Sequence, residues 1–110
     1  MFIEYDDYRL LELFESEPIY LPDEESGILM YIKEDDFGFK LILTISIYER
    51  TCDLSLNYCK FSKPVFEGNF QNIGRILATE DELKLVYDKD NTIAASLSFK
   101  TNFLISMNEK

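Results

Sequence analysis

The sequence contains no histidine and no tryptophan, and it has only two cysteines and four glycines in 110 residues. Without histidine, the commonest general base and the commonest metal ligand are both missing, and a Ser–His or Cys–His nucleophile cannot be assembled. The four glycines are scattered, so no glycine-rich loop is available to hold a phosphate. No apolar run approaches the roughly 20 residues that a membrane-spanning helix requires. We therefore expect a protein that is not an enzyme, needs no cofactor and does not enter a membrane.

The scarcity of cysteine also bears on the compartment. Cys52 and Cys59 are seven positions apart and flank a predicted strand, so an odd spacing places them on opposite faces of that strand. We expect two free, partly buried thiols rather than a disulfide, which fits a reducing environment. Two cysteines without histidine are too few for a metal site. No secretory signal is recognised at the acidic N-terminus, and a cytoplasmic location is expected.

Basic residues are scarce, and the charge is unevenly distributed. The chain has 21 acidic and 11 basic residues, for a net charge of −10. Residues 37–110 are balanced, so residues 1–36 carry all of the net charge. Their only basic residues are Arg9 and Lys33. Their acidic residues are Glu4, Asp6, Asp7, Glu12, Glu15, Glu17, Asp23, Glu24, Glu25, Glu34, Asp35 and Asp36.

A negative charge of this size selects among partners. Phosphates would be repelled, so neither nucleic acid nor an anionic membrane surface is expected to bind directly. A basic protein partner would instead be attracted and steered towards the acidic segment. The alternative is that the acidic surface only keeps the protein soluble.

The hydrophobic pattern predicts one helix followed by strands. Residues 7–16 have helical spacing, with Asp7 as N-cap and Leu10 and Phe14 on one face. From residue 27 the pattern alternates with period two, and a short strand at 65–66 is also considered. The predicted strands are residues 27–33, 39–48, 53–58, 72–79, 83–87, 92–99 and 102–107. Short turns favour antiparallel neighbours. The sequence thus predicts a single mainly β domain, residues 1–110, built as an antiparallel sandwich or curled barrel-like sheet of about seven strands.

Three groups of side chains are candidates for a site. A carboxylate pair could serve a glycosidase, but the acids fall in turns and on a helix face. Asp35 with Asp36, and the run 88–91, could contact a hard cation, although ordinary turn chemistry explains both. Tyr5, Tyr8 and Tyr20 lie within the acidic segment. Tyrosine rings beside carboxylates suit a partner rich in lysine and arginine, the alternative being that these rings only cover the edge of the core.

The chain resembles a known group of proteins in its general character. The features are an early acidic helix at 8–17, the strand 39–48 followed by Glu49, Arg50, Thr51 and Cys52, and a late hairpin that ends at 102–105. In these respects it resembles the small acidic immunity proteins of bacterial toxin systems, including contact-dependent inhibition. The resemblance implies that the chain binds one cognate toxin, often a nuclease, and blocks its basic active site.

Two functions from different classes follow. The first is an immunity protein that occludes a toxin with an acidic surface, and the second is a small-ligand-binding or regulatory β domain. For the first, the expected partner-binding residues are Tyr8, Glu12, Glu15, Glu17, Asp23, Glu24, Glu25, Asp35 and Asp36.

Overall fold

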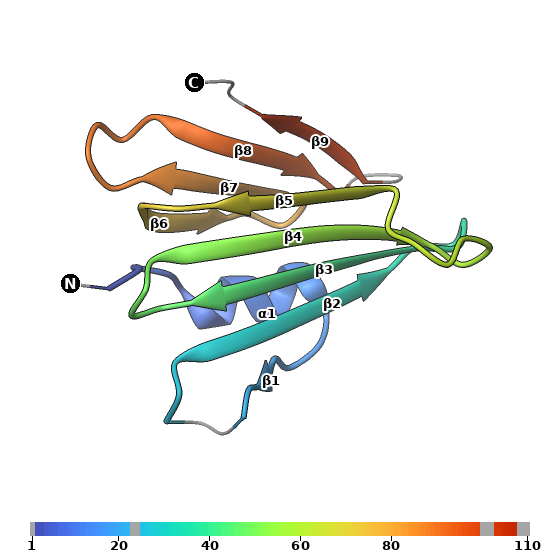
Figure 1. The fold of residues 1–110 in the computed structure, drawn as a ribbon, viewed down its shortest axis with the longest axis horizontal. Coiled ribbons are helices and arrows are strands. Elements are labelled where there is room, and N and C mark those ends of the chain that lie inside the picture. Colours follow the sequence, from blue (N-terminus) through green and yellow to red (C-terminus); the bar gives the residue numbers. More distant parts are fainter. Residues whose placement is uncertain (1, 23–24, 100–102, 108–110) are drawn as a thin grey trace.

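The computed structural model describes residues 2–22, 25–99 and 103–107, which form one helix and nine strands in two antiparallel sheets (Figure 1). The five-stranded sheet has the order β1-β2-β3-β4-β5 and the four-stranded sheet the order β6-β7-β8-β9. The elements are α1 (Asp7–Phe14), β1 (Ile19–Tyr20), β2 (Ile28–Glu34), β3 (Phe39–Ser46), β4 (Thr51–Tyr58), β5 (Phe66–Phe70), β6 (Ile73–Ala78), β7 (Glu82–Tyr87), β8 (Ile93–Ser98) and β9 (Leu104–Met107).

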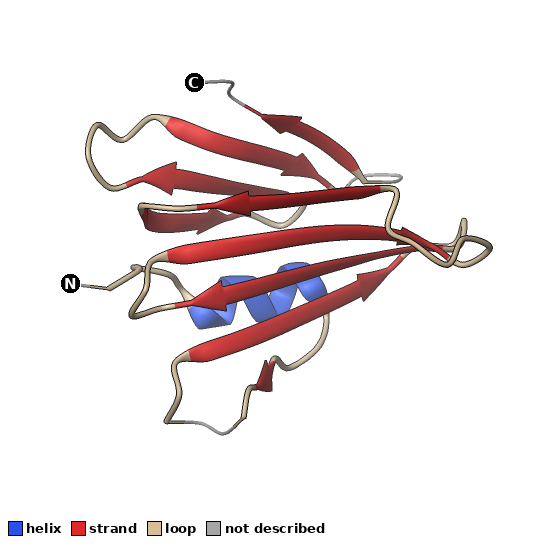
Figure 2. Cartoon of the chain, in the orientation of Figure 1, coloured by secondary structure: helices blue, strands red, loops and turns tan. Residues whose placement is uncertain are grey.

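Each strand pairs with its neighbour in sequence, except that the chain passes from one sheet to the other between β5 and β6. Only Gln71 and Asn72 make this passage, and Asn72 adopts a left-handed conformation with φ 60°. The two sheets splay apart rather than close, as Figure 2 shows. The predicted mainly β, antiparallel architecture with one short helix is confirmed in outline. The described strands form two separate sheets and no closed barrel, so the sandwich fits them better than the barrel-like alternative.

Two strands go beyond the seven that the sequence predicts. β1 is only two residues long and pairs Ile19 with Met30 and Tyr20 with Leu29. β5 is five residues long where a two-residue strand was considered, although it contains Gly68 and Asn69, which favour turns. The rings of Phe66 and Phe70 cover Gly68, and the Asn69 amide donates a 2.5 Å hydrogen bond to Asp53 on β4. These cross-strand contacts override the local preference for a turn.

The N-cap of helix α1 lies one residue earlier than the sequence predicts. Its N-cap is Asp6 rather than Asp7, because the Asp6 carboxylate accepts hydrogen bonds from the backbone N–H groups of Tyr8 at 3.0 Å and Arg9 at 3.3 Å. The helix ends at Phe14, since Glu15 turns into the left-handed region at φ 57°. The correction matters because the Asp7 side chain is left free for other contacts.

The core lies between the two sheets and under α1. The inward side chains of β3 are Leu41, Leu43 and Ile45, all fully buried, and the helix contributes Leu10, Leu13 and Phe14. Helix α1 contacts both β2 and β6, so it bridges the inner faces of the two sheets.

The N-terminal segment joins the sheets a second time. The Ile3 N–H donates to the carbonyl of Ile47 just after β3, while Glu4 forms a parallel bridge with Arg75 on β6. The chain is thereby fixed on both sides just before Tyr5. No helix in the described ranges is long and apolar enough to cross a membrane.

The cysteines are both free, as expected, but they differ in exposure. Cys52 is completely buried on β4, and burial raises the pKa of its thiol to about 12. Cys59 lies just beyond β4 and is exposed rather than partly buried.

Candidate functional site

The structure describes seven of the nine predicted contact residues and places them at three positions along the chain. Tyr8, Glu12, Glu15 and Glu17 lie on or just after α1, and all four are exposed. Glu25 precedes β2, whereas Asp35 and Asp36 follow it, so the length of β2, about 20 Å, separates the two loops. Asp23 and Glu24 lie outside the described residues. The acidic segment therefore does not form one compact patch.

Two of the predicted glutamates are engaged within the chain. The Glu15 carboxylate lies 2.5 Å from the Lys33 ammonium, which also donates to the carbonyl of Leu13 at the end of α1. The hydrogen bond and the charge of Lys33 lower the pKa of Glu15. Glu12 makes a looser 4.0 Å pair with Arg9 one turn earlier. Both of these glutamates remain accessible, and part of their charge is offset by the neighbouring base.

Asp35 has a clear structural task. One of its carboxylate oxygens accepts hydrogen bonds from the N–H groups of Phe37 and Phe39, each at 2.9 Å, and so closes the turn between β2 and β3. Gly38 completes this turn at φ 95°, a conformation that side-chain-bearing residues rarely adopt. Asp36 is exposed in the same turn.

A small cleft of about 180 Å³ opens between α1, the segment after it, β1 and β2. We call it the tyrosine cleft. The apolar side chains of Leu11 and Pro18 form part of its wall. The polar side chains that line it are Tyr5, Asp7, Tyr8, Glu17, Tyr20 and Tyr31.

The polar side chains of the tyrosine cleft make no side-chain hydrogen bonds or ion pairs with the described residues. Within the part of the chain that the structure describes, no hydrogen bond or ion pair involves the side-chain oxygens of these four tyrosines and two carboxylates. Tyr31 is the most unusual of them, since its side chain is fully buried and its hydroxyl finds no hydrogen-bond partner among the residues that the structure describes. Burial is the largest of the effects that raise the pKa of Tyr31. The nearby Tyr5 and Tyr20 and the carboxylates of Asp7 and Glu17 raise this pKa further. The phenol therefore stays protonated at neutral pH.

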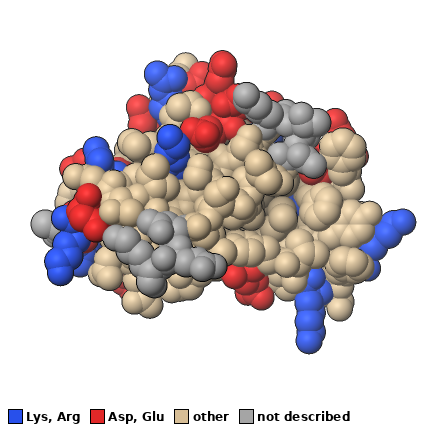
Figure 3. All heavy atoms as spheres, turned by 90° about the horizontal axis from the view of Figure 1, so that it is seen from above, with Lys and Arg blue, Asp and Glu red and all other residues tan. Residues whose placement is uncertain are grey.

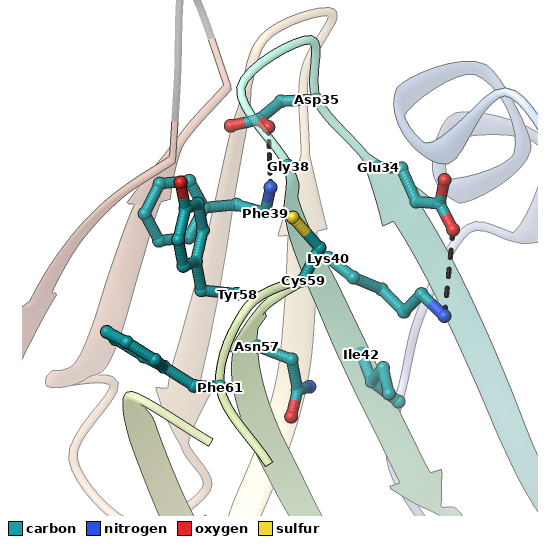
Figure 4. Close-up of a pocket in the computed structure, with 10 residues that line it drawn as sticks. All are labelled: Glu34, Asp35, Gly38, Phe39, Lys40, Ile42, Asn57, Tyr58, Cys59 and Phe61. Carbon is teal, nitrogen blue, oxygen red and sulfur yellow. Dashed lines mark hydrogen bonds and ion pairs between the residues drawn. The ribbon is translucent and has the colours of Figure 1, made fainter. Parts of the chain in front are cut away.

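A larger hollow of about 480 Å³ lies where β3 begins and β4 ends, next to the turn that Asp35 closes. Figure 4 shows the rings of Phe39, Tyr58 and Phe61 gathered on one side of it. The Phe39 and Tyr58 centroids are 4.8 Å apart, and Phe61 meets Tyr58 edge to face at 5.4 Å. On the other side Lys40 forms a 3.6 Å pair with Glu34. The hollow is open at the surface and is lined by both charged and aromatic groups.

One face of the molecule carries side chains of both charges. Seen from the side of β9, acidic and basic side chains lie close to each other around a largely uncharged middle (Figure 3). No group of three or more potential metal-ligating side chains occurs among the residues that can be described.

Sequence reasoning found only part of the tyrosine cleft. Tyr8 and Glu17 were predicted as contact residues, and Tyr5 and Tyr20 as tyrosines within the acidic segment. Asp7 was missed because it was assigned to the helix cap. Tyr31 was missed because its position in an alternating strand indicates only a core residue. The available signal was its hydroxyl, since a buried tyrosine normally finds a hydrogen-bond partner.

Comparison with known proteins supplies one match. No protein-family model and no curated protein matches the sequence. The chain is similar to a chain of a solved structure described as a contact-dependent growth inhibition toxin–immunity protein complex from Klebsiella pneumoniae 342. The TM-score is 0.76, the sequence identity is 16%, and the match covers 98% of each chain. The two proteins therefore share the whole of this fold.

Proposed function

We propose that this chain is an immunity protein that binds a cognate bacterial toxin and neutralises it. The observation that carries the proposal is the match over 98% of both chains to a structure described as a toxin–immunity protein complex. The independent resemblance of the acidic sequence to immunity proteins supports the same conclusion. Fold alone does not determine function, so the proposal also needs support from the surface.

The chemistry of the chain favours the inhibitor over the toxin as the role of this protein. The sequence has no histidine, and its first 36 residues carry the entire net charge of −10. A toxin that cleaves nucleic acid must attract phosphates, which this segment would repel. An inhibitor of such a toxin gains from the same charge, because carboxylates can occupy the place of the nucleic-acid backbone in a basic cleft.

The proposed mechanism is steric and electrostatic occlusion of a basic active site, that of a nuclease in our proposal. The exposed side chains of Tyr8, Glu12 and Glu17 would supply the first contacts, and Glu15 would join them at the edge of its pair with Lys33. The loop carboxylates would extend this surface towards both ends of β2. Those that the structure describes are Glu25, Asp35 and Asp36, and Asp23 and Glu24 are proposed from the sequence alone.

Co-expression with the candidate toxin tests the proposal. The protein encoded immediately upstream of this chain's gene is produced alone and together with the chain, and growth and complex formation are recorded. The proposal predicts that the neighbour arrests growth, that the chain restores it, and that the two copurify as a 1:1 complex. A toxic neighbour that the chain neither binds nor neutralises would contradict the proposal.

The hollow beside Asp35 supports the second candidate function, a small-ligand-binding β domain. Its volume of about 480 Å³ falls in the range of pockets that hold small molecules, roughly 300–1,000 Å³. A thermal-shift screen against a metabolite library tests this function. A ligand that stabilises the wild type but not a Tyr58→Ala variant would favour it over a toxin-binding role.

A further inference from the structure

We infer that the tyrosine cleft is a receptor for one arginine side chain of a protein partner, with the Tyr31 hydroxyl as a hydrogen-bond acceptor in its wall. This inference rests on the proposed function, because it specifies how a basic toxin would be held. It adds four polar residues that the proposed acidic surface does not include, Tyr5, Asp7, Tyr20 and Tyr31.

The size of the cleft indicates a single side chain. Its volume of about 180 Å³ is below the roughly 300 Å³ at which pockets for drug-sized molecules begin. Its wall is formed by rings and by the apolar Leu11 and Pro18. Such a wall can cover the methylene stem of a long side chain while the charged head meets the polar groups.

The polar groups of the cleft are arranged for a cation. Asp7 contributes a carboxylate from the start of α1, and Glu17 contributes another from the segment after the helix. Neither carboxylate forms an ion pair with a base in the described part of the chain. The positive end of the helix dipole lies near Asp7 and would oppose a cation. The Asp6 carboxylate offsets it by capping the first N–H groups of the helix.

The Tyr31 hydroxyl is the observation that requires a ligand. A buried polar group without a partner costs stability, and the Tyr31 hydroxyl is buried beside the cleft with no partner among the described residues. Its ring is fixed by Phe14 on the helix, with the centroids 5.2 Å apart. The protonated phenol carries one O–H donor, and its oxygen can also accept a hydrogen bond from a donor that enters the cleft.

A guanidinium group fits this set better than an ammonium group. It is planar and can stack on the ring of Tyr8 or Tyr20, whose side chains are 66% and 41% exposed. Its five N–H donors can reach two carboxylates and a phenol oxygen at the same time. An ammonium group offers three donors and is more strongly hydrated, so it loses more on entering a cleft of this size.

The test uses the isolated chain and a small probe, so it does not depend on the toxin. Nα-acetyl-arginine methylamide is titrated into the ¹⁵N-labelled protein, and the amide shifts of Tyr5, Tyr8 and Tyr20 are followed by NMR. The matched citrulline compound, which is neutral and nearly the same shape, is the control. We expect saturable shifts at the cleft with arginine, and weak, unsaturated shifts with citrulline.

Substitutions then identify the groups responsible. Tyr31→Phe keeps the ring and removes the hydroxyl, and we expect it to weaken arginine binding by about fivefold or more. Glu17→Gln removes one carboxylate and is expected to have a similar effect, whereas Glu67→Gln on the exposed side of β5 is the matched control without effect. Equal binding of arginine and citrulline, tighter binding of the corresponding lysine compound, or shifts that map elsewhere would overturn the inference.

The same variants separate this inference from the proposed function. If the chain neutralises the toxin and Tyr31→Phe leaves toxin affinity unchanged, the arginine receptor is refuted and the immunity function stands. If the cleft binds the arginine probe but the chain rescues no toxin, the receptor stands and its protein partner lies outside toxin neutralisation.

Discussion

The buried hydroxyl of Tyr31 leads to an unusual prediction for folding stability. The Tyr31 side chain is buried, and its hydroxyl has no hydrogen-bond partner in the described chain. Replacing Tyr31 by phenylalanine therefore removes an unsatisfied group and keeps the ring contact with Phe14. An unsatisfied buried hydroxyl costs about 1–3 kcal/mol, and the small void left by the missing oxygen offsets part of the gain. We therefore expect Tyr31→Phe to raise the free energy of unfolding by about 1 kcal/mol.

Urea and thermal unfolding followed by circular dichroism measure this effect. In a domain of 110 residues, 1 kcal/mol corresponds to a rise of about 4 °C in Tm. Tyr8→Phe is the matched control, because the Tyr8 side chain is 66% exposed and its hydroxyl is free to bond with water. If Tyr31→Phe lowers the free energy of unfolding by about 1 kcal/mol or more, the hydroxyl forms a hydrogen bond in the free protein. The Tyr31 oxygen would then not be available to accept a hydrogen bond from a partner.

Three further predictions concern the cysteines, the Asp35 turn and the dependence of stability on pH. In the native protein Ellman's reagent should modify Cys59 and spare the buried Cys52, with both thiols reacting in urea, and a second fast native thiol would contradict the core described above. Asp35→Ala should lower the free energy of unfolding by about 1–2 kcal/mol, since two N–H groups lose their acceptor, whereas Asp36→Ala should leave urea unfolding unchanged. Burial raises the pKa of both Tyr31 and Cys52, so the folded state binds these protons more tightly than the unfolded state does. The stability that these two groups contribute is complete below pH 9 and is lost as the pH rises through their pKa values in the folded state. The urea concentration at the midpoint of unfolding should therefore fall between pH 9 and 12. A midpoint that does not change over this range would contradict the burial of the two groups.

The sequence predicts the β architecture well because alternation is a direct consequence of strand geometry. Residues 39–48 alternate over their length, and the strand β3 occupies Phe39–Ser46 with Leu41, Leu43 and Ile45 inward. β1 has no such signal, since two residues cannot show a period. β5 was underestimated because Gly68 is stabilised by the neighbouring Phe rings, a tertiary effect that local propensity does not contain.

The sequence predicts which residue types the site contains but not how they are arranged. The acidic first third indicates a basic partner, but the contacts that sort its members are three-dimensional. Glu15 pairs with Lys33, which is 18 positions later, and Asp35 is held by backbone N–H groups of its own turn. Tyr31 reaches the cleft because α1 crosses β2, which no pattern in residues 27–33 reveals.

The rate of association with the toxin shows whether the acidic N-terminal third forms the contact surface. Glu12, Glu17 and Glu25 are changed together to lysine, and the control exchanges three exposed acids of the balanced remainder, Glu49, Glu67 and Glu80, in the same way. Both variants change the net charge equally, so only the position of the charge differs. The account predicts that the first variant associates at least about tenfold more slowly at low salt and loses the salt dependence of the wild type, while the control changes little. Equal rates for the two variants would contradict the claim that the acidic N-terminal third meets the toxin.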